Sequence, residues 1–575
     1  MKPMARVACI SAAVLAVANS VLGGTSLPRD DDDGTGDLPS VLECFQVTSP
    51  VLTAKGLVTG KTLVGPTDMS KQPRTSCQET LVEHSFQNSY GQPFVADYYP
   101  PECEFNRVVM NLTVVSEGIQ FDRLAIMYLG DTEVWRTSTA EPKAYPGISW
   151  SYWKDMTSYI SLWKIKQKLI FDLGNIVDNH YTGAFNVTLR ATFFATTVAG
   201  KDDKLDPAEL IVPISAKRGG QGQSSAFNYP GDVAATNITI PRNVIRAMVS
   251  VSATGQGNEE FWQTNVPDSI LDKTPGYFGM SAYREARLFI DGQLAGLAWP
   301  FPVVFTGGIS PPLHRPMVGI QAFDLLENEI DITPWLGVLC DGEPHTFSIE
   351  IVGENSERPN SNWVITGKVF TWFDDKNDRY TKGPAPTAKI SPTALDAEGD
   401  EYQGQVWYTQ GMVRTLKLTA DLEIKGKKET YGWTQRYSMH NNGNISNSGN
   451  DQYVNAIYEG ESTATRGWLP YFYVGFRYPF EMNFTATNES QSVKMSADLT
   501  QGIDLTVTGK AAFSYGVDAF ANRLESPVSG SAPPSAGATG IVVSAVVASG
   551  SRVVGERLRG REVAEIVAER LARLV

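Results

Sequence analysis

The alternating residue pattern from Phe121 to Leu129 limits the possible folds of this chain more than any other stretch. Alternate residues of a β-strand face opposite sides of a sheet. One face of this strand would carry Asp122, Leu124, Ile126 and Tyr128. Both faces are largely apolar, which predicts a strand in the interior of a sheet. Asp122 would lie at the mouth of the strand, where loss of water raises the pKa of a carboxyl. Arg123 would point the opposite way and would not neutralise Asp122 directly.

Similar patterns recur along most of the chain. Between residues 119 and 194 we expect five or six short strands that carry carboxylates and indole rings. The 575 residues include 51 Gly and 33 Pro, and 10% are aromatic, a composition that favours short strands and turns over helices. One core does not extend over this length. We therefore predict an all-β protein of several domains.

Changes in composition divide the chain. Residues 1–23 have Lys2 and Arg6 before an apolar run, which is typical of a secretory signal peptide. Residues 24–42 form an acidic linker, and 201–226 and 376–400 are two further polar linkers. These leave β domains at 43–200 and 227–375 and a third β-rich region at 401–523, which we expect to be a structural or carbohydrate-contacting layer. Within the second domain, Asp291-Gly292 predicts a tight hairpin. Residues 524–575 form a low-complexity tail, either disordered or amphipathic.

Charge and missing motifs exclude several classes of function. The net charge is −14, from 63 acidic and 49 basic residues, which disfavours a nucleic-acid partner. The chain lacks a Gly-x-Ser-x-Gly motif, a Walker loop and a dinucleotide fingerprint. Its five histidines are scattered without the spacing of metal ligands, so we expect no metal and no cofactor. No apolar segment after the signal is long enough for stable membrane insertion.

Cysteines and sequons fit a secreted protein. Removal of the signal peptide would remove Cys9 and leave four cysteines, and an even number in an oxidising compartment suggests two disulfides. Cys77 and Cys103 form the first expected pair because they close a moderate loop, and Cys44 with Cys340 is the remainder. The candidate glycosylation sites are Asn111, Asn186, Asn237, Asn444, Asn483 and Asn488. Asn186 is the best of them, because alternation places it on the solvent face of a strand.

The chemistry that remains is that of carboxylates beside indole rings. The first domain carries such residues at Asp122, Glu133, Trp135, Glu141, Trp150, Trp153, Asp155, Trp163, Asp172 and Asp178. The second domain has the loop Asn258-Glu259-Glu260-Phe261-Trp262. Paired acids activate water and protonate leaving groups, and flat aromatic faces stack on sugars. The residues alone indicate a secreted protein that acts on or binds glycans, and the alternative for each acid is a solvated loop carboxylate.

Two long stretches resemble the peptide-N-glycosidase A family of plants and fungi, the peptide-N4-(N-acetyl-β-glucosaminyl)asparagine amidases A. They are FDRLAIMYLGDTEVWRTSTAEP at 121–142 and YREARLFIDGQLAGLAWPFPVVF at 283–305, and the resemblance extends over residues 43–375. It implies tandem jelly-roll-like β-sandwich domains. It also implies an extracellular or vacuolar enzyme that hydrolyses the N-acetylglucosaminyl-asparagine amide of N-glycopeptides or N-glycoproteins, without a metal.

The resemblance also implies roles for particular residues. Phe121-Asp122-Arg123, followed by Glu133-Val134-Trp135-Arg136, is similar in order to the site strands of the smaller bacterial peptide-N-glycosidase. Asp122 would activate water, and the second-domain acid would be Glu259 or Glu260. Met280 and Ser281 depart from the expected pattern and leave that choice open. The candidates for substrate binding are Arg136, Glu141, Trp135, Trp150, Asp172, Asn175 and Trp262, and Trp262 and Glu260 would contact the first N-acetylglucosamine.

Other interpretations remain at this point. A non-enzymatic glycan-binding or cell-wall β-sandwich protein would bind glycans without turnover. A glycoside hydrolase would leave one sugar on the peptide. An amidase that uses Thr132 as an N-terminal nucleophile needs a layered α/β fold, and the many predicted strands argue against it.

Overall fold

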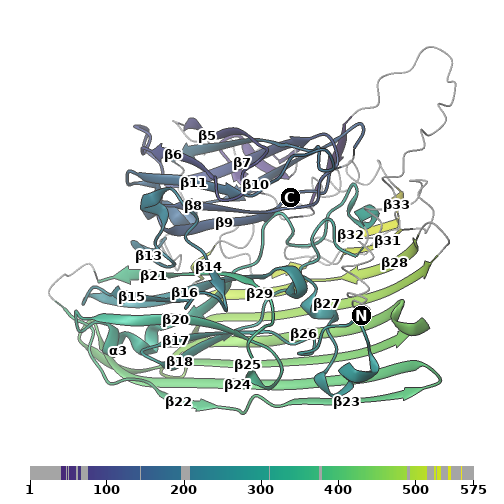
Figure 1. Cartoon of the computed structure of the whole chain (residues 1–575). Coiled ribbons are helices and arrows are strands. Elements are labelled where there is room, and N and C mark those ends of the chain that lie inside the picture. The colour runs from purple at the N-terminus through teal and green to yellow at the C-terminus, as the bar shows by residue number, and fades with distance from the viewer. Residues whose placement is uncertain are drawn as a thin grey trace.

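A computed structural model describes residues 41–46, 48, 51–59, 62–65, 76–142, 144–195, 207–309, 311–374, 379–488, 493–509 and 511–513, with the short segments 523–525, 528–532, 542–545 and 558–559 (Figure 1). The expected signal peptide, nearly all of the 24–42 linker and most of the 524–575 tail lie outside these residues. The strands of the described part pair almost entirely antiparallel, as the alternation and the turn residues predict.

The first sandwich has two sheets. The five-stranded sheet consists, in order, of β1 (Leu42–Cys44), β10 (Ile148–Asp155), β7 (Arg107–Ser116), β12 (Phe185–Phe194) and β5 (Ser76–Phe86). The four-stranded sheet consists of β6 (Phe94–Tyr98), β11 (Gln167–Leu173), β8 (Leu124–Leu129) and β9 (Thr132–Ser138). Three short strands pair separately, namely β2 (Val51–Thr53), β3 (Gly56–Thr59) and β4 (Thr62–Gly65), and the helical turns are η2 (Thr157–Tyr159) and α2 (Ile160–Trp163).

Strand β8 lies in the interior of its sheet, between β11 and β9, as its two apolar faces predict. Met127 packs into the first sandwich core. Ile126 and Tyr128 pack on the opposite side, against Val364 of the second sandwich. The strand starts at Leu124, so Asp122 precedes it rather than forming part of it.

The second sandwich also has two sheets. One contains β13 (Leu210–Ile214), β21 (Trp363–Phe373), β16 (Val244–Gly255) and β19 (Asn328–Asp331), with β14 (Phe227–Tyr229) on β21. The other contains β15 (Ala235–Thr239), β20 (Pro344–Val352), β17 (Glu285–Ile290) and β18 (Gln293–Ala298). The helical elements are η3 (Gly219–Gln221), η4 (Gly257–Glu259), η5 (Trp262–Thr264), η6 (Asp268–Lys273), η7 (Pro311–His314), η8 (Thr333–Trp335), α3 (Leu336–Leu339) and η9 (Glu354–Ser356).

The second sandwich tests two predictions from the sequence, the hairpin at Asp291-Gly292 and the linker at 201–226. Asp291 and Gly292 have φ angles of 49° and 75° between β17 and β18, so the predicted hairpin is confirmed. Strand β13 falls inside the 201–226 linker, yet it pairs with β21 along its length. Residues 210–214 therefore belong to the second sandwich, because their apolar side chains complete its core.

The third region is one large sheet of long strands, drawn in green across the lower part of Figure 1. It contains β22 (Thr387–Ile390), β23 (Leu395–Tyr402), β24 (Gln405–Ile424), β25 (Lys427–Ser446), β26 (Asp451–Arg466), β27 (Leu469–Asn488), β28 (Val493–Gln501) and β29 (Asp504–Gly509), with the turn η10 (Asn447–Gly449). The short segments β30 (Arg523–Glu525), β31 (Val528–Ala532), β32 (Val542–Ala545) and β33 (Leu558–Arg559) extend the pairing. Strands β22 and β23 pair with β24, so much of the expected 376–400 linker is sheet edge; its charged residues are those typical of an edge strand.

One face of this sheet covers the second sandwich. Gln435 accepts a hydrogen bond from Leu297 N–H and donates one to Leu297 C=O, both at 2.8 Å. Tyr458 donates to Ala282 C=O at 2.8 Å, and Gln501 donates to Pro302 C=O at 2.6 Å. Apolar side chains of all three regions form one continuous core. The alternate residues of the long strands consequently face away from the second sandwich.

The cysteines only partly match the sequence expectation. Cys77 and Cys103 form a disulfide, which confirms the first pair. The second pair is wrong, because Cys44 and Cys340 are both free and buried. Cys44 Sγ contacts the carbonyl of His314, whereas Cys340 Sγ contacts that of Val244. An even count does not require pairing, since a thiol also packs as a small apolar group.

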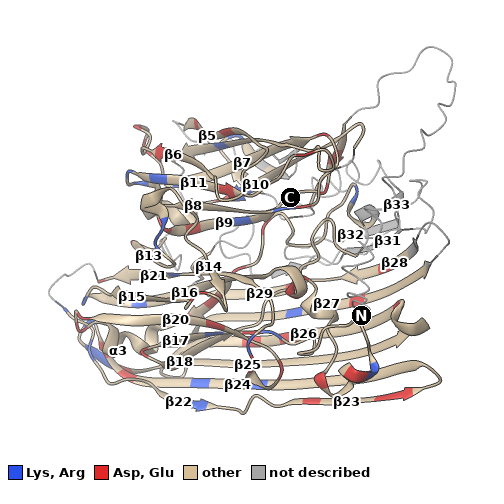
Figure 2. Cartoon of the chain, in the orientation of Figure 1, with Lys and Arg blue, Asp and Glu red and all other residues tan. Residues whose placement is uncertain are grey.

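Within the described ranges, no helix has the length and apolar character needed to cross a membrane. The same residues hold no group of three or more metal-ligating side chains placed to bind an ion. In the ribbon of Figure 2, positions of Lys or Arg and of Asp or Glu are interspersed along the described strands and loops.

Candidate active site

The β8–β9 hairpin brings Asp122 and Glu141 together. Leu124 pairs with Ser138 at the open end of the hairpin. Beyond that pair, Arg123 N–H donates to Thr139 Oγ1 and Thr139 N–H donates to Arg123 C=O, both at 2.8 Å. Asp122 comes immediately before Arg123 and Glu141 comes two residues after Thr139, so the hairpin makes the two carboxyls neighbours.

Gly307 lies between these two carboxyls. Its loop is tied to the hairpin by Thr306 Oγ1, which donates to Thr139 C=O at 2.8 Å. A Cβ on Gly307 would lie 2.2 Å from Asp122 Oδ1 and 2.3 Å from Glu141 Oε2, closer than atoms can approach. The Gly307 N–H also hydrogen-bonds Asp122. A side chain at this position would displace the two carboxyls, because their oxygens occupy its space.

Glu260 completes the cluster from the loop after β16. A Cβ on Gly308 would lie 2.9 Å from Phe261 Cε1, so this loop touches the one that carries Gly307. The charges of Asp122 and Glu141 both raise the pKa of Glu260. Asp122, Glu141 and Glu260, here called the acid cluster, therefore come from both sandwiches.

The three carboxyls have raised pKa values for the same reasons. Burial raises the pKa of Asp122 to about 6, although its own backbone amide, Arg123 and the Gly307 N–H work in the opposite direction. Burial and then the charge of Asp122 raise the pKa of Glu141 to about 8, and burial with both other acids raises that of Glu260 to about 8. Between these values Asp122 is ionised while the two glutamates hold protons. Arg123 lowers the pKa of Asp122 through its charge, while its Nη2 donates to Gln120 Oε1 at 2.6 Å.

Arg315 holds one side of Glu141. Its Nη2 donates to the Glu141 carbonyl at 3.1 Å and to the Pro142 carbonyl at 3.2 Å, and it lies 3.5 Å from Glu141 Oε1. Glu141 Oε2 is buried and has no hydrogen-bond partner among the described residues. This oxygen faces Gly307, so it is the one left to contact a bound molecule.

Glu259 lies next to Glu260 in sequence but has different partners. Its carboxylate accepts bonds from Arg284 Nε at 2.5 Å, Arg284 Nη2 at 2.8 Å and Trp363 Nε1 at 2.9 Å. Arg284 also donates to the carbonyls of Met280, Ser281 and Tyr283. Glu259 thus anchors the loop that presents Glu260, and the structure does not bring it into the acid cluster.

Arg136 is also placed away from the cluster. It pairs with Glu133 through two bonds of 2.9 and 2.7 Å and donates to Thr254 Oγ1 at 2.8 Å and Val364 C=O at 2.7 Å. Its side chain is only 2% exposed, which leaves no room for a substrate. The sequence suggested a binding role, but these contacts join the two sandwiches.

The remaining candidates have structural surroundings. Trp135 and Trp150 are buried and stack on Tyr152 and Phe323. Asn175 is buried and donates to the carbonyls of Phe86 and Gly183. Burial raises the pKa of Asp172, which hydrogen-bonds Ser224. Trp262 is buried edge-on against Tyr458, so it supports the Glu260 loop. None of these contacts reaches the three acids.

Among the sequons, Asn186, Asn237 and Asn483 are exposed, whereas Asn111 and Asn444 are partly buried. Asn111 donates to Ser151 and Asn444 to the Val406 carbonyl. Asn488 ends strand β27.

Sequence reasoning missed Gly307 and Arg315. The adjacent glycines at 307 and 308 follow a buried, Pro-containing segment, and such a pair is a signal of close backbone approach. Arg315 gave no signal of its own, because the residues that it contacts are more than a hundred positions away.

Three partly buried carboxyls thus lie where loops of two β-sandwiches meet, an arrangement of the kind that acid–base hydrolysis can use. The chain belongs to the peptide N-acetyl-beta-D-glucosaminyl asparaginase amidase A family, whose model matches residues 66–389. A second model, the PNGase_A C-terminal domain, matches residues 407–480. The first match includes all three acids, Gly307 and Arg315.

A relative with an assigned activity is the peptide-N4-(N-acetyl-beta-glucosaminyl)asparagine amidase A of Prunus dulcis. It is 33% identical over 347 residues, which are 57% of this chain and 60% of the relative. The chain thus spans less than two thirds of the length of that protein.

Two solved structures are similar in part. PNGase F, a glycosylasparaginase from Flavobacterium meningosepticum, has 12% identity and a TM-score of 0.34, with 52% of this chain and 96% of that one covered. PNGF-II has 12% identity and a TM-score of 0.34, with 58% of this chain and 66% of that one covered.

Proposed function

We propose that this protein is a secreted amidase that hydrolyses the bond between N-acetylglucosamine and asparagine in N-glycopeptides or N-glycoproteins. The observation that carries the proposal is the acid cluster, in which loops of two sandwiches bring three carboxyls together beside Gly307 and burial raises the pKa of each. Amide hydrolysis needs both a base for water and an acid for the leaving nitrogen. Family membership and the almond relative support this choice of amide.

The steps follow from the protonation states. The Asp122 carboxylate takes a proton from water as the water oxygen attacks the side-chain amide carbon. A protonated glutamate, Glu141 or Glu260, donates a hydrogen bond to the amide oxygen as negative charge develops there. The C–N bond then breaks as the nitrogen takes a proton from the cluster. The products are an aspartate in the peptide and a glycosylamine, which releases ammonia in water.

Arg315 and Gly307 prepare this arrangement. Arg315 holds Glu141 through Oε1, and Oε2 faces Gly307. The N–H of Gly307 stabilises the ionised form of Asp122. In this proposal Glu260 acts from the second-domain side, while Glu259 serves to position its loop. The Cys77–Cys103 disulfide supports an oxidising, extracellular or vacuolar location.

The test is mass spectrometry of a defined N-glycopeptide incubated with the protein in heavy-oxygen water. We expect an aspartate product that carries one heavy oxygen. A product that retains one N-acetylglucosamine would indicate a glycoside hydrolase. An unchanged glycopeptide, from protein shown to be folded, would contradict the amidase and favour a glycan-binding protein.

A further inference from the structure

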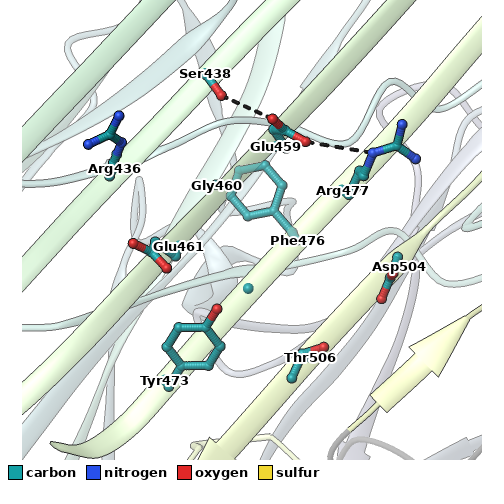
Figure 3. Close-up of a pocket in the computed structure, with 11 residues that line it drawn as sticks. Arg436, Ser438, Glu459, Gly460, Glu461, Tyr473, Phe476, Arg477, Asp504 and Thr506 are labelled. Carbon is teal, nitrogen blue, oxygen red and sulfur yellow. Dashed lines mark hydrogen bonds and ion pairs between the residues drawn. The ribbon is translucent and has the colours of Figure 1, made fainter.

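The outer face of the long sheet has a polar hollow of about 360 Å³ (Figure 3). Strands β25, β26, β27 and β29 contribute its lining. The register places Glu461 and Thr506 on either side of Gly475. The register also places Glu459 and Asp504 on either side of Arg477, which is two residues after Gly475 on β27. The hollow therefore spans neighbouring strands rather than a loop.

Gly475 and Tyr473 form its base. A Cβ on Gly475 would lie 2.7 Å from the Tyr473 hydroxyl oxygen and 3.1 Å from its Cζ. The phenol ring therefore lies along the strand, over the glycine, instead of standing away from the sheet. The charge of Glu461, after burial, raises the pKa of Tyr473, which places this acid beside the ring. The base of the hollow is an aromatic surface with a carboxylate at its edge.

The rim carries donors and acceptors in alternation. Glu459 lies 3.6 Å from Arg477 Nε and accepts a hydrogen bond from Ser438 at 3.5 Å. The side chains of Arg477 and Glu459 are 50% and 52% exposed, so both can reach a bound molecule. Figure 3 shows Arg436 near one edge of the hollow and Asp504 near the opposite edge.

This combination fits a sugar. A pyranose has apolar C–H faces that stack on an aromatic ring, and its hydroxyls pair with planar carboxylates and guanidinium groups. Two arginines and three carboxylates line the hollow, so the charges nearly cancel. Such a rim does not suit a polyanion, which needs a net positive surface.

The hollow is separate from the acid cluster. Gln435 and Tyr458 face the second sandwich, and Tyr458 supports Trp262 beside Glu260. Arg436 and Glu459 follow these residues in the strands and face the other side, because alternate residues point in opposite directions. A sugar in the hollow is therefore not the sugar at the cleaved bond.

We propose that the outer hollow around Tyr473 is a second saccharide site, which binds a hexose of an N-glycan other than the one positioned for cleavage. The choice of an N-glycan rests on the proposed function, whereas the saccharide class rests on the hollow alone. The site would hold a densely glycosylated substrate on the enzyme.

The test is calorimetric titration of the full chain with a free oligomannose N-glycan. For the wild type we expect binding at two sites. Tyr473→Ala should lose one site or weaken it about tenfold or more, the scale of aromatic stacking on a ring. The matched control is Tyr453→Ala, since Tyr453 also faces outward on β26 but bonds Glu481 outside the hollow. Equal binding by wild type and Tyr473→Ala, or an equal loss in both variants, would overturn the proposal.

A second variant guards against a folding defect. Glu461→Gln keeps the shape of the hollow and should weaken the same site severalfold, with an unchanged thermal melt. A glycopeptide with only the two core N-acetylglucosamines should be hydrolysed at the wild-type rate by Tyr473→Ala. Tyr473-dependent binding without any hydrolysis would contradict the proposed amidase but support the saccharide site. Hydrolysis without Tyr473-dependent binding would support the amidase but contradict the saccharide site.

Discussion

Carboxylates are buried in two groups where the first and second sandwiches meet, and the two groups differ in how closely cations approach them. In the first group, Glu133 pairs with Arg136 and accepts a bond from Thr366 at 2.6 Å. Glu327 lies 2.5 Å from Lys368 Nζ. Burial raises the pKa of Glu327, but Lys368 and Ser250 outweigh it and lower the pKa overall. Both acids also accept hydrogen bonds from the other sandwich, Glu133 from Thr366 and Glu327 from Tyr159 at 2.8 Å.

The acid cluster differs from this first group in its charged partners more than in its burial. Glu141 has one arginine at 3.5 Å, and Asp122 and Glu260 are close to each other and to Glu141. Burial raises the pKa of Glu327 just as it raises those of the acid cluster, and the charges and hydrogen bonds nearby decide the net direction. A carboxyl that keeps its proton is of little use for joining domains, but it can donate that proton in a reaction.

The largest expected effect concerns the first group, in which Glu133 pairs with Arg136. Arg136→Met leaves Glu133 buried without its cation and should lower the free energy of unfolding by about 3–5 kcal/mol, as measured by urea denaturation. The double variant Glu133→Leu/Arg136→Met is the control and should recover most of the loss, because no charge remains unpaired. If Arg136→Met were fully stable yet inactive, the substrate-binding role suggested by the sequence would be correct.

The next prediction tests the acid cluster. Asp122→Asn should lower kcat on an N-glycopeptide on the order of a hundredfold or more, since the amide cannot take a proton from water. Its melting temperature should stay close to that of the wild type, because the change removes a repelling charge. Retention of more than about a tenth of the activity would show that another group activates water.

Neighbouring glutamates give a sharper comparison. Glu260→Gln should lower activity at least about tenfold and leave stability unchanged, because it removes a proton donor. Glu259→Gln should lower the free energy of unfolding by about 1.5–3 kcal/mol, because it removes charged hydrogen bonds to Arg284 and Trp363. Activity and urea unfolding would be measured for both variants. The reverse pattern would make Glu259 the second-domain acid.

The smallest effect concerns pH. Because the folded pKa values of Glu141 and Glu260 exceed their usual values, the folded state binds more protons than the unfolded state between about pH 4.5 and 8. This contribution to stability is present in mild acid and is lost as the pH rises through 8, by roughly 1 kcal/mol or more. Glu141→Gln should flatten this slope in urea unfolding measured across the range.

Activity should follow the same groups. The rate should fall below about pH 6 as Asp122 gains a proton and above about pH 8 as the glutamates lose theirs. A rate that rises steadily up to pH 10 would contradict a protonated glutamate as the acid.

Much of the fold could be predicted from local pattern. The interior position of β8 followed from its two apolar faces, and the β17–β18 hairpin followed from Asp291-Gly292. The extent of the sheets could not be predicted in the same way. Strands β13, β22 and β23 have polar or short sequences, and they form because a partner strand offers its edge.

The three acids of the cluster could be identified as candidates from the sequence. Asp122, Glu141 and Glu260 all stood among the candidates, through their apolar or aromatic neighbours and through the family resemblance. Glu259 could not be separated from Glu260, since adjacent positions have the same local pattern. Their difference depends on Arg284 and Trp363, which only the folded chain brings to Glu259.

The sequence by itself determined the strand-rich class, the family and the residues from which a site could be built. The alternation of apolar residues and the residue preferences of turns involve only a few neighbouring residues, so they can be recognised within one short segment of the sequence. The tertiary structure decided which carboxyls share a site and which are neutralised by arginine or lysine. It also decided that the carboxyls of Asp122 and Glu141 meet at Gly307 and that Cys44 and Cys340 remain apart. These features depend on distances between residues remote in sequence, and electrostatic and steric effects act through those distances.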